Sequence, residues 1–208
     1  MKPRTLAVAI TGGIASGKSE LASAFREMGA RVISADLEAK AILAGDRSVR
    51  RKIIGLLGGE AYASGGKVNR AFIADRIFSR PPLRRRVNAI VHPPVIRRVK
   101  RMIAGEKRSR RRRMVVVEAA LIYEAGMEDM FDAVIMVNAP AELRIARIRR
   151  RDGITRREAM GRIQAQGSNR KKASVADFIV ANRGDLRALR RSARFLHRLL
   201  SGIAGSWS

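Results

Sequence analysis

Apolar residues along this chain fall into short uninterrupted runs and into longer stretches with helical spacing. The short runs lack the alternation of a half-exposed strand, so they predict buried strands of a parallel sheet. Five segments are expected to be strands, at residues 6–10, 31–35, 114–121, 133–137 and 176–182, although 31–35, 114–121 and 176–182 also contain polar residues. The second of them leads directly into Asp36.

The intervals between these runs carry apolar residues at helical spacing. We expect helices around residues 21–25, 37–43 and 140–151, and a C-terminal helix that buries Leu186, Leu189, Ala193, Leu196 and Leu200. The pattern is helical throughout residues 46–106, with expected breaks at Gly58-Gly59, Pro81-Pro82 and Pro93-Pro94.

Two polar stretches complete the pattern. The basic run at residues 107–113 is expected to be a solvated loop, and residues 154–174 a polar helix followed by a loop rich in Ser, Asn and Lys. Strands that alternate with helices are typical of the α/β class, a parallel sheet covered by helices on both faces. The helical stretch 46–106, inserted between strands, predicts a subdomain that holds a substrate.

The segment between the first strand and the first helix fits the phosphate-binding pattern G-x-x-x-x-G-K-[ST]. It is Gly12-Gly13-Ile14-Ala15-Ser16-Gly17-Lys18-Ser19. Glycines allow a tight turn whose N–H groups point at an anion, and the following helix N-terminus favours phosphate. Lys18 adds a charge for the β- and γ-phosphates, and Ser19 a hydroxyl for Mg²⁺. A glycine-rich turn without a ligand is the alternative, but the flanking strand and helix favour a nucleoside triphosphate site.

Asp36 is the strongest candidate for a general base. We expect the strand that ends at Asp36 to lie directly beside the loop strand, which would bring its carboxylate near the γ-phosphate. There it can accept a proton from a substrate hydroxyl or orient Mg²⁺. Because a helix begins immediately afterwards, a helix N-cap is the alternative role, and one residue can serve both.

Several other charged residues are secondary candidates. Arg144, Arg147 and Arg151 lie on one face of a predicted helix. Arginines on a closing segment can stabilise a transferring phosphoryl group, although arginine-rich helix faces are more often only solvated. His92, at a predicted helix end, is expected to be structural rather than a base. Glu118, inside a buried strand, is a secondary candidate for a metal site.

Composition narrows the class of protein. The net charge is +26, and 35 of the 44 basic residues are arginine. Such a charge attracts polyanions, but aromatic residues make up only 4%, so platforms for base stacking are scarce. We expect no more than non-specific attraction to nucleic acid. The absence of cysteine excludes disulfides and thiolate metal sites, and no apolar run reaches the roughly 18 residues of a membrane span.

Seven short motifs follow one another along the chain. They are Thr11 to Ser19; Val32-Ile33-Ser34-Ala35-Asp36; Phe72 to Phe78 with Val87-Asn88-Ala89-Ile90-Val91-His92-Pro93; Leu121-Ile122-Tyr123-Glu124; Arg147 to Thr155; Arg162-Ile163-Gln164-Ala165-Gln166; and Ala176 to Asn182. In this order and with these gaps, the chain resembles the dephospho-coenzyme A kinase family over nearly its full length.

The resemblance implies ATP-dependent phosphorylation of the ribose 3′-hydroxyl of dephospho-coenzyme A, the last step of coenzyme A synthesis. It implies the α/β fold of P-loop nucleotide kinases, with ATP and Mg²⁺ as cofactors and a cytoplasmic setting without a membrane partner. The nucleotide-binding core would comprise residues 1–45, 107–149 and 173–208. A helical substrate domain would span residues 46–106, and a small lid residues 150–172.

The resemblance also assigns roles to single residues. It makes Asp36 the base and Arg147 a contact to the ATP phosphates. We also count Lys18 among the catalytic residues and place Glu20, which departs from the family pattern, near the bound phosphates at the end of the loop. We assign His92, Arg151 and Asn182, which lie in three of the motifs, to the substrate site.

Four positions depart from the family pattern. Ser34 replaces an aspartate, Glu20 a threonine, Ala120 a proline and Arg144 a common glutamine. Two other functions stay open: a P-loop kinase for a nucleoside or another small molecule, and an RNA-binding or regulatory P-loop protein that uses the charge.

Overall fold

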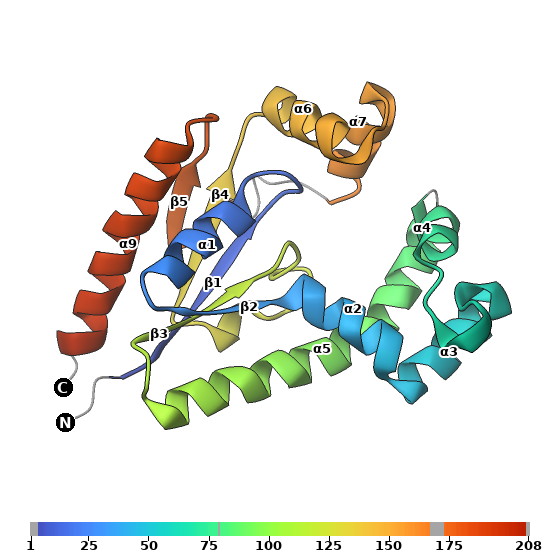
Figure 1. The fold of residues 1–208 in the computed structure, drawn as a ribbon, viewed down its shortest axis with the longest axis horizontal. Helices are drawn as coiled ribbons and strands as arrows, with labels where there is room; N and C mark the ends of the chain where they lie inside the picture. The colour runs from blue at the N-terminus through green and yellow to red at the C-terminus, as the bar shows by residue number, and fades with distance from the viewer. Residues whose placement is uncertain (1–3, 79, 167–172, 207–208) are drawn as a thin grey trace. The chain divides into compact units, whose positions relative to one another are not determined.

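The structure, a computed structural model, describes residues 4–78, 80–166 and 173–206. Its centre is a parallel sheet of β1 (Leu6–Gly12), β2 (Arg31–Ser34), β3 (Met114–Glu118), β4 (Ala133–Asn138) and β5 (Phe178–Ala181) (Figure 1). All five predicted strands and their parallel direction are confirmed. The order across the sheet is β2-β3-β1-β4-β5.

The position of β2 corrects one expectation. β2 pairs with β3, with Ser34 opposite Glu118, so β3 separates it from β1. The strand ends at Ser34 and α2 (Ala35–Gly45) begins at once, which puts Asp36 in the first turn of a helix. An apolar run indicates that a strand is buried, but β1 and β3 have the same pattern, so the neighbour of β2 cannot be read from it.

One face of the sheet packs against two helices, α1 (Lys18–Glu27) and α9 (Leu186–Ser206), as Figure 1 shows. Alternate strand residues, among them Val8 and Ile10, form a core with Phe25 of α1 and Leu196 of α9. Four of the five apolar residues expected on the buried side of α9 are buried, whereas Leu186, at the helix start, is exposed.

The chain divides into two compact units. One contains the sheet and comprises residues 1–34 and 102–208, and the other comprises residues 35–101. The second unit is helical, as expected, with α2, α3 (Arg47–Leu57), two short 3₁₀ turns (Gly59–Ala61 and Ser64–Gly66), α4 (Arg70–Phe78) and most of α5 (Pro81–Ser109). It begins at α2, which packs against α3, whereas the sequence suggested a boundary at residue 46.

Helix α5 corrects a second expectation. It runs from Pro81 to Ser109 without the predicted break at Pro93-Pro94. Buried valines at four-residue steps, Val87, Val91, Val95 and Val99, form one apolar stripe on both sides of the prolines. Packing of that stripe outweighs the loss of two backbone donors. His92 therefore lies inside a helix, and the start of the basic run 107–113 is helical instead of a loop.

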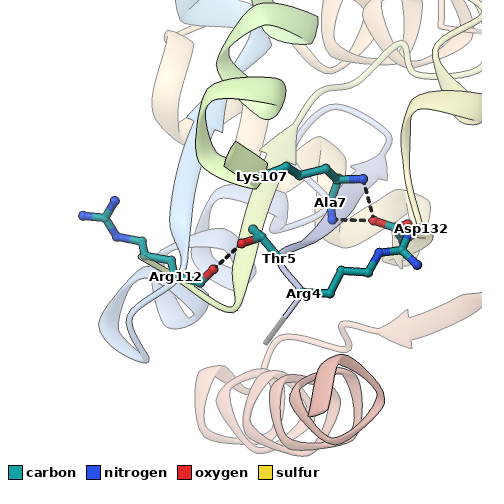
Figure 2. A network of polar contacts seen from close by, with 6 residues as sticks. All are labelled: Arg4, Thr5, Ala7, Lys107, Arg112 and Asp132. Atoms are coloured by element: carbon teal, nitrogen blue, oxygen red, sulfur yellow. Dashed lines mark hydrogen bonds and ion pairs between the residues drawn. The ribbon is translucent and has the colours of Figure 1, made fainter. Parts of the chain in front are cut away.

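A polar network joins the amino end of β1 to the segments around it (Figure 2). Asp132 accepts hydrogen bonds from the Ala7 amide at 2.7 Å and from Lys107 at 3.0 Å, and its other oxygen pairs with Arg4 at 2.6 Å. The Thr5 hydroxyl donates to the Arg112 carbonyl at 2.7 Å. None of the helices in the described ranges is long and apolar enough to cross a membrane.

Candidate active site

The phosphate loop joins β1 to α1 at the carboxyl edge of the sheet. Gly17 has a φ of 102°, in the left-handed region that favours glycine, and a Cβ there would collide with the Asn182 side chain. At Gly13 a Cβ would meet the Arg144 guanidinium, the end of a long side chain, which would have to move. Gly17 is thus favoured by the loop's own backbone conformation as well as by an approaching phosphate.

Lys18 is the first residue of α1 and is buried, with 8% of its surface exposed. Its Nζ donates to the Gly13 carbonyl at 3.1 Å, so the ammonium is folded over the loop. A cation held there, at a helix N-terminus beside backbone amides, suits the β- and γ-phosphates of a nucleotide.

Ser19 and Glu118 form the part of the site that suits a metal ion. The Ser19 hydroxyl donates to Oε1 of Glu118 at 2.6 Å, and Glu118 is the last residue of β3. A hydroxyl and a carboxylate side by side are hard oxygen ligands of the kind Mg²⁺ takes. In the part of the chain that the structure describes, no group of three or more Asp, Glu, His or Cys side chains forms a complete cage.

Two arginine side chains from α6 (Ala141–Asp152) donate hydrogen bonds to carbonyl groups of the phosphate loop. Arg144 donates from Nε to the Ile14 carbonyl at 2.9 Å, and Arg147 donates to the Ala15 carbonyl at 3.1 Å. Arg144 is 5% exposed, and burial lowers the pKa of its guanidinium, which remains a cation at neutral pH. The arginine face predicted from sequence thus includes two loop contacts.

Arg151, the third arginine of that face, has a different partner. It pairs with Asp152 at 2.7 Å, and Arg162 of α7 (Arg156–Gln164) pairs with the same carboxylate at 2.5 Å. The hydrogen bond from Arg151 and the charges of both arginines lower the pKa of Asp152. The structure thus joins Arg151 to the α6–α7 junction, while Arg144 and Arg147 contact the loop.

Asn182, just after β5, is 3% exposed. Its Nδ2 donates to the Ser16 carbonyl at 2.8 Å, and its Oδ1 accepts from Arg147 at 3.4 Å and from the Gly184 amide at 3.1 Å. Sequence reasoning assigned Asn182 to the substrate and missed these contacts with the loop. The motif that contains Asn182 was visible, but nothing in it indicates which segment its amide would meet.

The remaining sequence candidates lie elsewhere in the chain. Glu20 is exposed in the first turn of α1. Asp36 is exposed in the first turn of α2, and His92 is half-buried within α5; both belong to the unit of residues 35–101. Gln166, part of a quoted motif without an assigned role, accepts a hydrogen bond from the Ile14 amide at 2.5 Å.

A parallel sheet whose first strand leads into a Lys- and Ser-containing glycine loop is the architecture of P-loop nucleotide-binding proteins, a class that includes P-loop kinases. A shikimate kinase from Bacteroides thetaiotaomicron, 17% identical, has the same fold with a TM-score of 0.54 over 94% of this chain and 98% of its own. The family model for dephospho-CoA kinase matches residues 6–188. The chain belongs to the dephospho-CoA kinase family, whose members phosphorylate dephospho-coenzyme A to coenzyme A with ATP.

Individual relatives agree with this membership. The dephospho-CoA kinase of Moorella thermoacetica is 37% identical over 90% of this chain and 88% of its own length. That of Syntrophotalea carbinolica is 34% identical over 96% and 95%. Among solved structures, a Thermus thermophilus protein is 30% identical with a TM-score of 0.74, covering 95% of this chain and 98% of its own. The chain is therefore a phosphotransferase with an alcohol acceptor that uses ATP and Mg²⁺.

Proposed function

We propose that this chain transfers the γ-phosphoryl group of ATP to the ribose 3′-hydroxyl of dephospho-coenzyme A and does so in the cytoplasm. The observation that carries the proposal is a complete phosphate loop, with Lys18 and the Ser19–Glu118 pair in place, inside a chain that matches this family from residue 6 to 188. No feature of the described residues favours another acceptor.

The phosphate loop binds the nucleotide. Loop amides between residues 13 and 19, other than those of Ile14 and Ser16, hold the β- and γ-phosphates together with the Lys18 ammonium, with Glu20 at the adjoining helix start. Ser19 and Glu118 hold Mg²⁺, which, when bound, neutralises charge on the phosphates. Arg147, anchored on the Ala15 carbonyl, stabilises the charge that develops on the transferring group.

Asp36 accepts the proton of the attacking hydroxyl. It follows Ser34 by two residues, and Ser34 pairs with Glu118 across β2 and β3. Consecutive Cα atoms are about 3.8 Å apart, so the covalent chain keeps the Asp36 backbone within about 8 Å of that strand end. An exposed carboxylate tethered at the carboxyl edge of a parallel sheet is suited to meet a substrate hydroxyl there.

The helical unit of residues 35–101 holds dephospho-coenzyme A, with His92 as one of its contacts. Arg151 and Asn182 complete the substrate site, and residues 150–172 serve as a lid that excludes water during transfer. Part of that lid, residues 167–172, lies outside the described residues. Neither a membrane nor a specific nucleic acid is a partner in this proposal.

A screen of phosphate acceptors tests the proposal. Purified enzyme with Mg²⁺ and γ-labelled ATP would be offered dephospho-coenzyme A, adenosine, cytidine, AMP and shikimate. We expect label to enter dephospho-coenzyme A at a rate at least about a hundredfold above every other acceptor. The product should carry the label at the 3′ position, identified by mass spectrometry and phosphorus NMR. Preferred labelling of a nucleoside or of AMP would refute the acceptor while leaving the kinase class intact.

A further inference from the structure

The tip of the phosphate loop, Ile14-Ala15, is held by side chains far away in sequence. Both polar groups of Ile14 are used: its amide donates to Gln166 Oε1 at 2.5 Å, and its carbonyl accepts from Arg144 Nε at 2.9 Å. The Ala15 carbonyl accepts from Arg147 at 3.1 Å. Three hydrogen bonds from α6 and from the segment after α7 therefore set the orientation of three consecutive peptide units, from Gly13–Ile14 to Ala15–Ser16.

Apolar packing reinforces the same tip. Ile14 and Ala15 pack against a small core of Ile145, Ile148 and Ala159, contributed by α6 and α7. Ala15 has a φ of 59°, a left-handed conformation that costs a non-glycine residue about 1–2 kcal/mol. Such a conformation persists only where its surroundings enforce it. The surroundings here are the α6–α7 helices.

The position of Gln166 is itself well defined by the chain before it. α7 starts with a capping box, in which the Thr155 side chain accepts from the Glu158 amide and the Glu158 carboxylate accepts from the Thr155 amide. After α7 ends at Gln164, the Gln166 amide donates to the Ile163 carbonyl at 3.3 Å. This turn presents the Gln166 side chain to the loop, 152 residues away in sequence.

We propose that Gln166 is a positioning residue for nucleotide binding. Its side-chain carbonyl oxygen accepts the Ile14 N–H and so fixes the peptide unit between Gly13 and Ile14, which couples the phosphate loop to α7. When this bond is lost, the Ile14 amide can rotate, and only a fraction of molecules keep the loop ready for phosphate. The apparent dissociation constant rises by the inverse of that fraction. The inference deepens the proposed function and rests on it only for the use of the loop by a nucleotide.

Binding of Mg²⁺–ADP to the purified full chain, measured by calorimetry, tests the inference. Gln166→Ala should weaken ADP binding about tenfold. The loss of one hydrogen bond that keeps the phosphate loop ordered is expected to have an effect of this size. Gln164→Ala is the matched control, because Gln164 is the same residue type two positions earlier and is exposed. It should bind ADP as the wild type does. ADP needs no acceptor, so this test is independent of which alcohol the enzyme phosphorylates.

A second measurement separates positioning from a general loss of stability. In ¹⁵N-labelled protein, hydrogen exchange at the Ile14 amide should be about tenfold faster in Gln166→Ala than in the wild type, with unchanged exchange in the core of β1. Gln166→Glu keeps an acceptor oxygen at the same reach and should restore slow exchange at Ile14.

Each result of these experiments either supports or overturns the inference. Weakened ADP binding and fast Ile14 exchange confined to Gln166→Ala, with slow exchange restored in Gln166→Glu, support the inference. Unchanged ADP affinity in Gln166→Ala overturns it. So does an equal loss in Gln164→Ala, because the effect would then belong to α7 in general rather than to the bond with Ile14.

Discussion

Asp36 is the residue that we propose for the one step of the reaction that no residue of the phosphate loop can perform. The loop supplies cations and N–H donors, whereas deprotonation of an alcohol needs an acceptor, and general-base catalysis contributes about 10²–10⁴ in rate. We predict that Asp36→Ala lowers kcat at least about a hundredfold while the KM for ATP changes less than about threefold. Steady-state kinetics with dephospho-coenzyme A measure both parameters.

Asp75→Ala serves as the control for that experiment, since Asp75 is an exposed aspartate of α4 in the same unit. It should retain wild-type turnover. A kcat for Asp36→Ala within about threefold of the wild type would remove Asp36 as the base and leave another group, or water, as proton acceptor.

Glu118 supports Ser19 through the 2.6 Å hydrogen bond between their side chains. Replacing the carboxylate by an amide removes one negative charge beside the proposed Mg²⁺ position. Because Glu118 is proposed to hold Mg²⁺ with Ser19, we predict that Glu118→Gln raises the Mg²⁺ concentration needed for half-maximal activity at least about tenfold. Activity measured as a function of Mg²⁺ at fixed ATP provides the test. Glu128→Gln, an exposed residue outside the site, should leave the curve unchanged.

At the residue scale, motif chemistry predicted Lys18, Ser19 and the loop glycines because phosphate binding constrains residue types at adjacent positions. The structure puts Lys18 against the loop and Ser19 against Glu118, which had been only a secondary metal candidate. The contacts of Gln166 and Asn182 with the loop were not predictable, because each joins segments more than 150 residues apart. A single sequence carries no direct record of such pairings.

The α6–α7 junction is the element whose stability should depend on pH. Asp152 accepts ion pairs from Arg151 and Arg162, and its pKa is lowered in the folded state. A carboxyl with a lowered pKa stabilises the fold above its unfolded pKa of about 3.9, and that contribution is lost as the pH falls through the folded value. The contribution should therefore be constant near neutral pH and disappear in acid.

We predict that Asp152→Asn is less stable than the wild type at pH 7 by about 0.5 kcal/mol, as for other partly exposed ion pairs. The two proteins should converge as the pH is lowered below about 4. Urea unfolding followed by circular dichroism at a series of pH values gives the difference. Asp129→Asn, at an exposed position, should follow the wild type at every pH. A difference that persists unchanged in acid would mean that the carboxylate charge is not its cause.

At the element scale, the sequence predicted which segments are strands. It was less successful at predicting which strands lie next to one another and where the helices end. Short, mostly apolar segments gave all five strands. β1, β3 and β4 are buried along most of their length, whereas β2 and β5, at the two edges of the sheet, are only partly buried. The expected break at Pro93-Pro94 was wrong, since the valine stripe of α5 continues on both sides. The rule that proline breaks a helix describes the helix by itself. In the folded protein, burial of the valine stripe stabilises α5 across the two prolines.

The whole molecule carries many more basic side chains than it has carboxylates to pair with them. Only 18 carboxylates stand against 44 basic side chains, and several are already in ion pairs, as Asp132, Glu106 and Asp152 are. Counted one to one, the carboxylates can pair with fewer than half of the basic side chains. Their positive charge is spread over both units, on α5 and on α9 alike, with few aromatic residues among them.

Such a distribution predicts weak binding to RNA that depends on salt and not on sequence. A labelled random RNA oligonucleotide should bind with micromolar or weaker affinity at about 150 mM salt, and the affinity should rise at least about a hundredfold at 50 mM. Arg85→Gln on α5 and Arg194→Gln on α9 change exposed arginines in separate units, so each should reduce the salt dependence by about the same small amount. A nanomolar affinity at 150 mM salt, or a loss confined to one of the two variants, would instead indicate a dedicated nucleic-acid site. Because counterion release needs only charge and proximity, the expected result is compatible with a small-molecule kinase whose surface attracts polyanions in general.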